Sequence, residues 1–244
     1  MSQTVFLAGA SGAIGRRLVP ILVANGCRVV GMSRSAAKSA LLMELGASPV
    51  VADVFDALAV QRAIADARAD VVVHQLTDLP PGLDPSRMEE ATRRNARIRD
   101  EGTRNLVAAA VVAGVRRLVA QSIAFVYVDG PEPHGEKDAL AIDADGRAGI
   151  SARGVASLER QVLEAPLEGL VLRYGRLYGA GTGSDAPSGR APLHVDAAAR
   201  AAALAVATGE PGVYNIAESD GAVSSEKAER QLGWSAGWRW EPRR

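Results

Sequence analysis

The chain has 244 residues, enough to bury a sizeable core in one α/β domain with a small extra lobe but tight for two independent domains. Its 28 basic and 28 acidic residues balance, which argues against a nucleic acid, an anionic membrane or another polyanion as partner. The single cysteine, Cys27, excludes an intrachain disulfide and a cysteine-built metal cluster. We therefore expect a small-molecule partner and, since no signal peptide or bilayer-length apolar run is present, a cytoplasmic location.

Short apolar runs alternate with helical patterns along the chain. The runs that predict strands are residues 4–8, 28–32, 50–52, 71–75, 117–121, 170–173 and 213–216. The patterns that predict helices are residues 14–25, 36–45, 57–67, a long one over 85–113, then 151–164 and 196–208. This alternation indicates a doubly wound α/β architecture, in which helices cover both faces of a parallel sheet.

Three segments rich in Gly, Pro and Asp interrupt this alternation, at residues 78–84, 129–149 and 179–192. Each follows the carboxyl end of a predicted strand. Open parallel sheets bind ligands beyond these strand ends. We therefore expect the three loops to build a substrate pocket.

The segment between the first strand and the first helix carries glycines spaced GxxGxxG. Gly9 permits a tight turn, Gly12 lets the backbone approach a pyrophosphate, and Gly15 lets the helix pack against the strand. Backbone N–H groups at the helix start then face the anion. This context predicts a Rossmann dinucleotide site, against the alternative of a plain strand-to-helix turn, and its expected cofactor contacts are Gly9, Ser11, Gly12, Ala13 and Ile14.

The end of the second predicted strand selects between the two nicotinamide dinucleotides. An acidic residue there would accept from the adenosine ribose hydroxyl, but the sequence places Ser33 and Arg34 at this point. A guanidinium beside a hydroxyl suits a 2′-phosphate, so we predict NADP in preference to NAD. The alternative is that Arg34 is a solvated loop charge, with Lys38 as a second cation nearby.

A further motif begins within the long predicted helix: GTRNLVAAA at residues 102–110, which continues to AGVRRLVAQS. This motif resembles the GTxNLxxAA…GVxRxVxxSS stretch of the extended short-chain dehydrogenases, the epimerase/dehydratase group. The segments VADV, LRYGRLYGAGTG, LHVDAAARA, VYNIAES and QLGW resemble further parts of that family, so the likeness covers almost the whole chain. The resemblance implies that Asp53 and Val54 contact adenine, with Asp53 also a candidate cap for the next helix, and that Leu76 and Thr77 line the cofactor's ribose and pyrophosphate. It also implies a homodimer formed through two long helices.

From the glycine loop and this resemblance we predict two parts packed as one globular unit. Residues 1–175 are expected to form an NAD(P)-binding Rossmann domain, and residues 176–244 a small C-terminal substrate-binding lobe.

The family's proton-transfer motif, Tyr-x-x-x-Lys, does not occur in the sequence. In the family the tyrosine is the acid or base, and the lysine lowers its pKa and holds the nicotinamide ribose. Alignment on Glu159, which resembles the motif's downstream glutamate, puts Val155 at the lysine position and Ser151 at the tyrosine position. Neither side chain supplies the family's chemistry directly.

Other positions of that machinery also differ. The serine pair that usually ends the fifth strand reads Ser-Ile at 122–123, and the usual asparagine of the long helix is Arg99, a candidate for contact with an anionic substrate. The remaining candidates for proton transfer are Ser122, Tyr127, Tyr174 and, in a loop, His134. For each tyrosine the alternative is a core residue with its hydroxyl at the rim.

The sequence offers neither paired zinc-ligand spacing among its three histidines nor a GxSxG elbow, so we expect no metal site and no α/β-hydrolase. The favoured function is an NADP-dependent oxidoreductase or epimerase-like enzyme that acts on a small carbonyl or hydroxyl compound without the Tyr-x-x-x-Lys pair. The alternative is a non-catalytic NADP-binding regulator or scaffold. Bound cofactor with no turnover of any substrate would favour the second.

Overall fold

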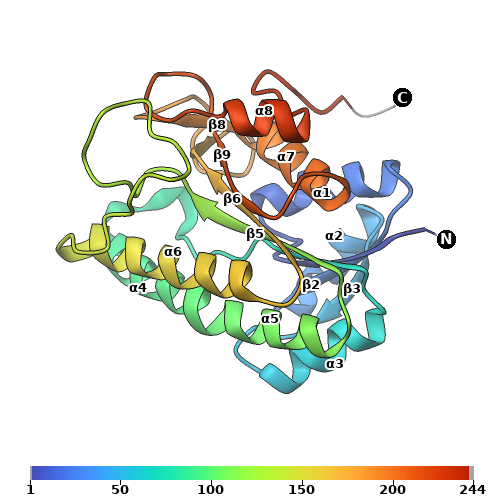
Figure 1. The fold of residues 1–244 in the computed structure, drawn as a ribbon. Coiled ribbons are helices and arrows are strands. Elements are labelled where there is room, and N and C mark those ends of the chain that lie inside the picture. Colours follow the sequence, from blue (N-terminus) through green and yellow to red (C-terminus); the bar gives the residue numbers. More distant parts are fainter. Residues whose placement is uncertain (1, 242–244) are drawn as a thin grey trace.

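The computed structural model describes residues 2–241 and centres on a seven-stranded sheet of order β3-β2-β1-β4-β5-β6-β9 (Figure 1). Every neighbouring pair of strands is parallel. The strands are β1 (Thr4–Ala8), β2 (Arg28–Ser33), β3 (Ser48–Val51), β4 (Val71–His74), β5 (Arg117–Ile123), β6 (Glu168–Tyr174) and β9 (Gly212–Ile216). The predicted doubly wound parallel sheet is therefore confirmed.

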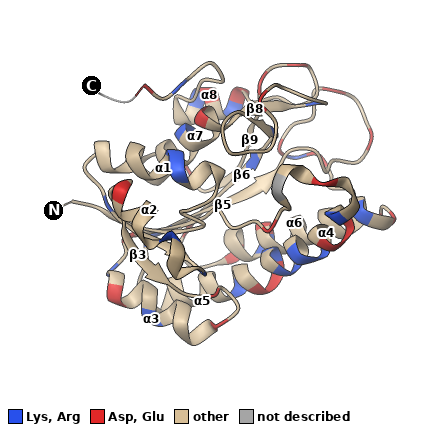
Figure 2. Ribbon diagram, turned by 180° about the vertical axis from the view of Figure 1, so that it is seen from behind, with Lys and Arg blue, Asp and Glu red and all other residues tan. Residues whose placement is uncertain are grey.

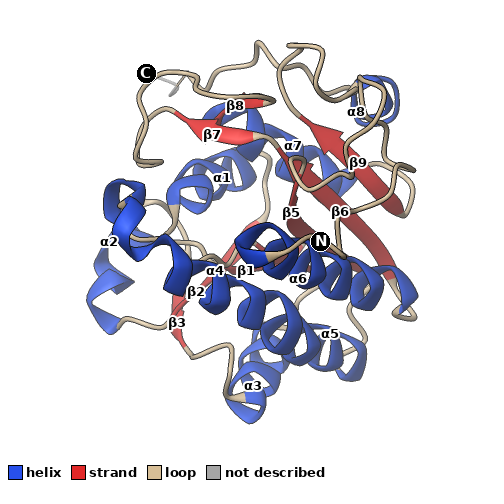
Figure 3. Cartoon of the chain, turned by 90° about the vertical axis from the view of Figure 1, so that its left-hand side faces the viewer, coloured by secondary structure: helices blue, strands red, loops and turns tan. Residues whose placement is uncertain are grey.

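Helices cover both faces of the sheet, as Figures 1 and 3 show. One face carries α3 (Ala57–Ala67), α4 (Met88–Arg97), α5 (Thr103–Val112) and α6 (Gly146–Glu164). The other carries α1 (Ala13–Ala24), α2 (Ser39–Glu44), α7 (Val195–Ala207) and α8 (Glu226–Leu232). The two largest apolar clusters lie between the sheet and these two helical layers, which holds the strand ends rigidly in place.

The order of the strands fixes where a ligand binds. The chain proceeds outward from β1 through β2 to β3, then returns to β4 on the other side of β1. Where the connections leave in opposite directions, open parallel sheets bind ligands in a crevice beyond the carboxyl ends of the strands, here those of β1 and β4. The glycine loop between β1 and α1 lies at this crevice.

The long helix predicted over residues 85–113 is a continuous helical stretch with a widened turn. After a 3-10 turn, Pro85–Arg87, α4 passes into a π-helical turn, Ile98–Gly102, and then into α5. A Cβ on Gly102 would lie 3.2 Å from Val54 Cγ1, so the glycine lets this turn approach the loop after β3. Such π turns recur at functional sites, and this one carries Arg99.

Residues beyond 175 contribute to two structures. A small parallel sheet is formed by β7 (Arg176–Tyr178) and β8 (Pro192–His194), which lie beside the main sheet. From the same part of the chain, α7 and β9 complete the main layers. The division at residue 175 into a nucleotide domain and a substrate lobe stays a prediction.

Charges of both signs alternate along α4 (Figure 2). Its exposed side chains form ion pairs one helical turn apart, such as Arg93 with Glu89 at 2.7 Å and Arg97 with Glu101 at 2.7 Å. These pairs lie in water and contribute little stability each. The basic run is therefore a mixed-charge helix surface.

Candidate cofactor and active site

The glycine loop brings the backbone of β1, α1 and β4 into close contact. Gly9 has φ +91°, and a Cβ there would lie 2.5 Å from the Gln75 carbonyl oxygen. A Cβ on Gly15 would lie 2.4 Å from the Gly9 carbonyl oxygen. Both positions exclude any side chain, so the tight turn and the close packing of α1 expected from the sequence have a steric cause.

The start of α1 suits an anionic ligand. Its N-cap is Gly12, and no side chain caps its first N–H groups. A Cβ on Gly12 would meet only the Gly9 carbonyl oxygen, at 3.3 Å, so the glycine leaves the approach to these donors open. Ile14 is 4% exposed, which leaves only its backbone to face a ligand, while Ser11 and Ala13 are half-buried beside it. These residues fit a dinucleotide pyrophosphate.

The structure places Arg34 directly after β2, with its guanidinium exposed. Arg34 Nη2 lies 2.9 Å from Asp78 Oδ1, and Asp78 also pairs with Arg94 at 3.0 Å. The buried Ser33 hydroxyl accepts from the Ser35 N–H at 3.2 Å. Arg34 thus bridges from the β2 end to the loop after β4, over the crevice where the adenosine end of a dinucleotide would lie.

The predicted adenine contacts lie in the turn after β3. Asp53 Oδ1 accepts from the Phe55 N–H at 3.0 Å. The side chain that caps α3 is Asp56, which accepts from the Ala59 N–H at 3.0 Å, so the prediction of a helix cap at Asp53 is wrong. The reason is that α3 begins at Ala57, three residues beyond the position that Asp53 could cap.

The other predicted cofactor residues differ in exposure. Val54 is buried, Leu76 is half-buried and Thr77 is exposed beyond the end of β4. The Leu76 N–H donates to His74 Nδ1 at 3.2 Å, which leaves the neutral ring to donate from Nε2 to Thr103 Oγ1 at 3.2 Å. Burial, followed by the charge of Arg99, lowers the pKa of His74 to about 4, so this ring is a neutral structural link.

Two of the three predicted catalytic residues belong to one buried network. The Ser122 hydroxyl donates to Glu159 at 2.8 Å, and Glu159 accepts from Arg173 at 2.6 and 2.8 Å. Arg173 donates to the Tyr127 hydroxyl at 2.9 Å, which in turn donates to Asn215 at 2.5 Å. Burial is the main cause that raises the pKa of Tyr127. Both hydroxyl groups are thus engaged within the protein.

The third candidate, Tyr174, lies on the opposite face of the sheet, in the cluster under α1 and α7. It is 1% exposed, and its hydroxyl accepts from Gln75 at 3.3 Å. Burial raises its pKa far above the ordinary value. His134 stacks on Tyr127 with ring centroids 4.9 Å apart, and its Nδ1 lies 3.0 Å from Asp138. The structure therefore brings Ser122, Tyr127 and His134 to one side and leaves Tyr174 on the other.

The positions of the family's serine and lysine are apolar and packed together. Ile123 and Val155 share a buried cluster with Val126 and Ala152. Val155 and Ala152 are fully buried, and Ile123 is 8% exposed. No proton donor can act from the centre of this cluster.

Loops after the strands line a cavity of about 190 Å³. Its walls come from the segment after β5, from β7 and the loop after it, and from a segment after β9 that the sequence did not indicate. They include Phe125, Tyr127, His134, Arg176, Arg190 and Val223. Arg176 lies over the Phe125 ring at 4.4 Å. Two of the three loops predicted to form a substrate pocket thus meet there.

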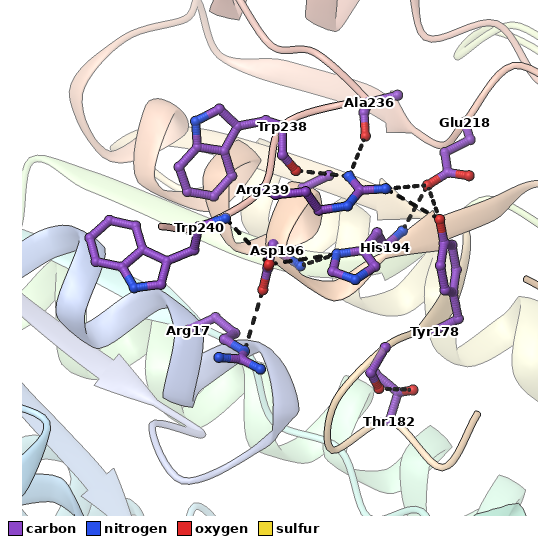
Figure 4. Close-up of polar contacts among 12 residues, drawn as sticks. Arg17, Tyr178, Thr182, His194, Asp196, Glu218, Ala236, Trp238, Arg239 and Trp240 are labelled. Atoms are coloured by element: carbon purple, nitrogen blue, oxygen red, sulfur yellow. Dashed lines mark hydrogen bonds and ion pairs between the residues drawn. The ribbon is translucent and has the colours of Figure 1, made fainter. Parts of the chain in front are cut away.

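A polar cluster anchors the loop between β7 and β8 (Figure 4). The Tyr178 hydroxyl donates to Glu218 at 2.8 Å, and Arg17 on α1 lies 3.3 Å from Asp196 on α7. A Cβ on Gly181 of this loop would lie 3.8 Å from Ala13 Cβ. The loop therefore lies against the start of α1, a contact between segments too distant in sequence for any local pattern to reveal.

The sheet order and the glycine cradle define a Rossmann-type dinucleotide-binding protein. The NAD(P)H-binding family matches residues 9–183 of the chain. The chain therefore belongs to the NAD(P)H-binding family, and its structure is like those of the NAD-dependent epimerase/dehydratase enzymes.

A curated relative from a Streptomyces species, 3-diazoavenalumate denitrifying reductase, is 41% identical over 91% of this chain and 78% of its own length. Among solved structures, UDP-glucose 4-epimerase of Thermotoga maritima with UDP-glucose has a TM-score of 0.79 at 18% identity, covering 96% of this chain and 94% of that one. UDP-glucose 4-epimerase of Bifidobacterium longum with NAD⁺ and UDP has a TM-score of 0.75 at 18% identity, covering 97% and 94%. Both structures share the fold of this chain, and the second of them holds NAD⁺.

Within residues 2–241, no helix has the length and apolar character needed to cross a membrane. Across the same part of the chain, no three His, Cys, Asp or Glu side chains gather as potential metal ligands.

Proposed function

We propose that this protein is an NADPH-dependent reductase that reduces an aryl diazonium compound with loss of nitrogen, a reaction in which the protein need not supply a proton. The proposal replaces the small carbonyl or hydroxyl substrate predicted from the sequence with a diazonium compound. It keeps the predicted NADP preference and the absence of the Tyr-x-x-x-Lys pair.

The observation that carries the proposal is the apolar cluster of Ile123 and Val155. Reduction of a carbonyl adds hydride to carbon and a proton to oxygen, so it needs an acid near the oxygen. Here the serine and lysine positions of the family are buried hydrocarbon, and Ser151 is at the tyrosine position. The two apolar positions supply no acid for an oxyanion and are compatible with hydride transfer alone.

An aryl diazonium group needs only a hydride. When bound, NADPH supplies that hydride, and the nicotinamide is oxidised to NADP⁺. The aryl carbon gains a C–H bond, the C–N bond breaks, and its electron pair leaves with N₂. Atoms and charge balance without a proton, because a cation and a hydride give a neutral arene and a neutral gas. The 41% identical reductase, whose name specifies a diazo substrate and denitrification, supports this choice.

Arg34 supports NADP as the cofactor. Its guanidinium is exposed at the end of β2, where the 2′ position of the adenosine ribose would lie. Asp78 holds it in place at 2.9 Å and leaves other N–H groups of the fork for a phosphate. A 2′-phosphate would compete with the Asp78 carboxylate for the Arg34 guanidinium, so cofactor affinity depends on both Arg34 and Asp78.

The test follows the origin of the new hydrogen atom. The protein is incubated with 3-diazoniocinnamate, made from 3-aminocinnamate and nitrite, and with NADPH deuterated at nicotinamide C4 in either stereochemical position. We expect cinnamate with one deuterium at ring carbon 3 from one of the two NADPH isomers, and none when unlabelled NADPH is used in D₂O. Deuterium acquired from D₂O, or equal product formation without protein, would refute the proposal.

Two other results decide between the remaining functions. Turnover of a carbonyl panel with NADPH, together with no product from the diazonium salt, would indicate a carbonyl reductase. Binding of NADPH with no turnover of either would indicate a regulator or scaffold. The engaged hydroxyls of Ser122 and Tyr127 are the observation that favours this last alternative.

The predicted homodimer is also a proposal. The mixed-charge surface of α4 offers a face on which a second copy could pack, as the family resemblance implies. Sedimentation equilibrium of the purified protein measures this state directly, and a monomer at micromolar concentration would contradict it.

A further inference from the structure

Arg99, on the π-helical turn, is a largely desolvated cation that forms no ion pair within residues 2–241. Its one hydrogen bond there runs from Nη1 to Ser151 Oγ, at 3.3 Å. Burial is the main cause that lowers the pKa of Arg99 to about 10, which still leaves it charged at neutral pH. A buried charge is costly unless a partner compensates it.

Other arginines that lie partly or wholly out of solvent have such compensation. A carboxylate lies within ion-pair distance of each of Arg17, Arg94, Arg117 and Arg173. Arg200 lies over the ring of Trp238. Arg99 differs from these arginines because, among the described residues, its guanidinium N–H groups face neither a carboxylate nor an aromatic ring. Glu159, the acidic group whose charge it senses, is engaged by Arg173 and Ser122.

The packing directs Arg99 toward the crevice. A Cβ on Gly154 would lie 3.0 Å from Ala96 Cα and 3.5 Å from Arg99 Cδ, so the arginine stem crosses α6 where the two helices are closest. From there the guanidinium reaches Ser151, which is nearer the start of α6. This end of α6 follows the loop after β5, on the same side as the strand carboxyl ends.

A dinucleotide in this crevice has a defined direction. Its pyrophosphate would lie at the glycine loop and its adenosine end toward Arg34, after β2. The nicotinamide would then extend beyond β4 and β5. Arg99 lies close enough to His74, at the end of β4, to contribute to the lowered pKa of that ring.

We infer that Arg99 and Ser151 together bind a carboxylate of the substrate at the nicotinamide end of the crevice. The inference rests on the proposed function and names the anchoring group of its substrate. A guanidinium fork matches a carboxylate with two parallel hydrogen bonds. Ser151 accepts from Arg99 and keeps its own hydrogen to donate to a carboxylate oxygen. The bound anion would supply the countercharge that Arg99 lacks.

The experiment measures binding of two matched probes to the protein saturated with NADP⁺: cinnamate, which is a carboxylate, and cinnamamide, its neutral analogue. Calorimetry is carried out on wild type, Arg99→Met, Arg99→Lys, Ser151→Ala and Arg93→Met. Arg93 is an exposed arginine of α4 that pairs with Glu89, so its variant controls for loss of one charge on the same helical stretch.

We expect wild type to bind cinnamate at least about tenfold more tightly than cinnamamide, since a hydrogen bond to a charged group contributes about 1.5–3 kcal/mol. Arg99→Met should remove this preference, Arg99→Lys should retain part of it, and Ser151→Ala should weaken cinnamate about threefold or more. Arg93→Met and the affinity for NADPH should stay unchanged. The Lys variant keeps the charge if Met does not fold.

Equal affinity of wild type for the two probes, an unchanged preference in Arg99→Met, or an NADPH affinity that falls as much as that for cinnamate would each overturn the inference. The measurement needs no turnover, so it separates the two proposals. Cinnamate binding that depends on Arg99, without denitrification of the diazonium salt, would refute the proposed function and leave the carboxylate site standing.

Discussion

Replacing Gly9 with alanine tests the glycine loop both as a fold element and as a cofactor site. An alanine at φ +91° adopts a left-handed conformation that costs about 1–2 kcal/mol. Its Cβ would also lie 2.5 Å from the Gln75 carbonyl oxygen, which is backbone and cannot turn away. Overpacking of this kind costs about 1–3 kcal/mol, so we expect the free energy of unfolding to fall by about 2–5 kcal/mol.

Gly26→Ala is the matched control. Gly26 has φ +81°, and a Cβ there would meet nothing within 4 Å. Both substitutions restrict the unfolded chain equally, so that contribution cancels in the comparison. Gly26→Ala should therefore lower the free energy of unfolding by only about 1–2 kcal/mol, the cost of the left-handed backbone.

Urea denaturation gives the two free energies, and calorimetry at a temperature where both variants are folded gives the affinity for NADPH. We expect Gly9→Ala to weaken NADPH binding by about tenfold or more, because a shifted turn moves the N–H groups at the start of α1. Gly26→Ala should bind as wild type does. Equal destabilisation by the two variants would refute the steric reasoning, and unchanged NADPH affinity in Gly9→Ala would refute the placement of the cofactor.

Three further predictions test the site and its supports. Arg34→Ala should weaken NADPH about tenfold or more and leave NADH unchanged, while Lys38→Ala changes neither by more than about twofold; titrations with both cofactors check this. Glu159→Ala leaves Arg173 buried without its carboxylate and should cost about 3–5 kcal/mol in urea denaturation, against less than about 0.5 kcal/mol for exposed Glu164→Ala. Because the folded pKa of His74 is about 4 and its ordinary value 6.5, stability should fall by up to about 3 kcal/mol as the pH drops between these values. His74→Gln should abolish that part of the acid sensitivity.

The main sheet and the glycine loop could be predicted because both depend on local patterns. Fully buried parallel strands are continuous apolar runs, and β1 was predicted with its observed bounds, Thr4–Ala8. The small sheet of β7 and β8 was missed because each strand has three residues, too few to show a periodicity. The helix α8 was missed because its seven residues, most of them polar, are too few to show a helical apolar periodicity.

The surroundings of the catalytic candidates could not be predicted, because they depend on tertiary contacts. Ser122 and Glu159 are 37 residues apart, and Tyr127 and Asn215 are 88 apart, so no spacing rule joins them. The side to which Tyr174 points follows from strand alternation once Arg173 is known to face α6. Only the packed structure supplies that last fact.

The electrostatics of the site connect the apolar cluster to the proposed chemistry. In the family's carbonyl reduction, a lysine ammonium beside the reaction centre lowers the pKa of the tyrosine that protonates the developing oxyanion. The same ammonium would repel a diazonium cation, and Val155 at that position removes the repulsion. Arg99 would restore an unfavourable charge if it stood alone, but a substrate carboxylate bound to it forms a neutral pair. An anionic substrate that also carries a cationic leaving group therefore fits both Val155 at the family's lysine position and Arg99 at its asparagine position. A neutral carbonyl compound fits neither.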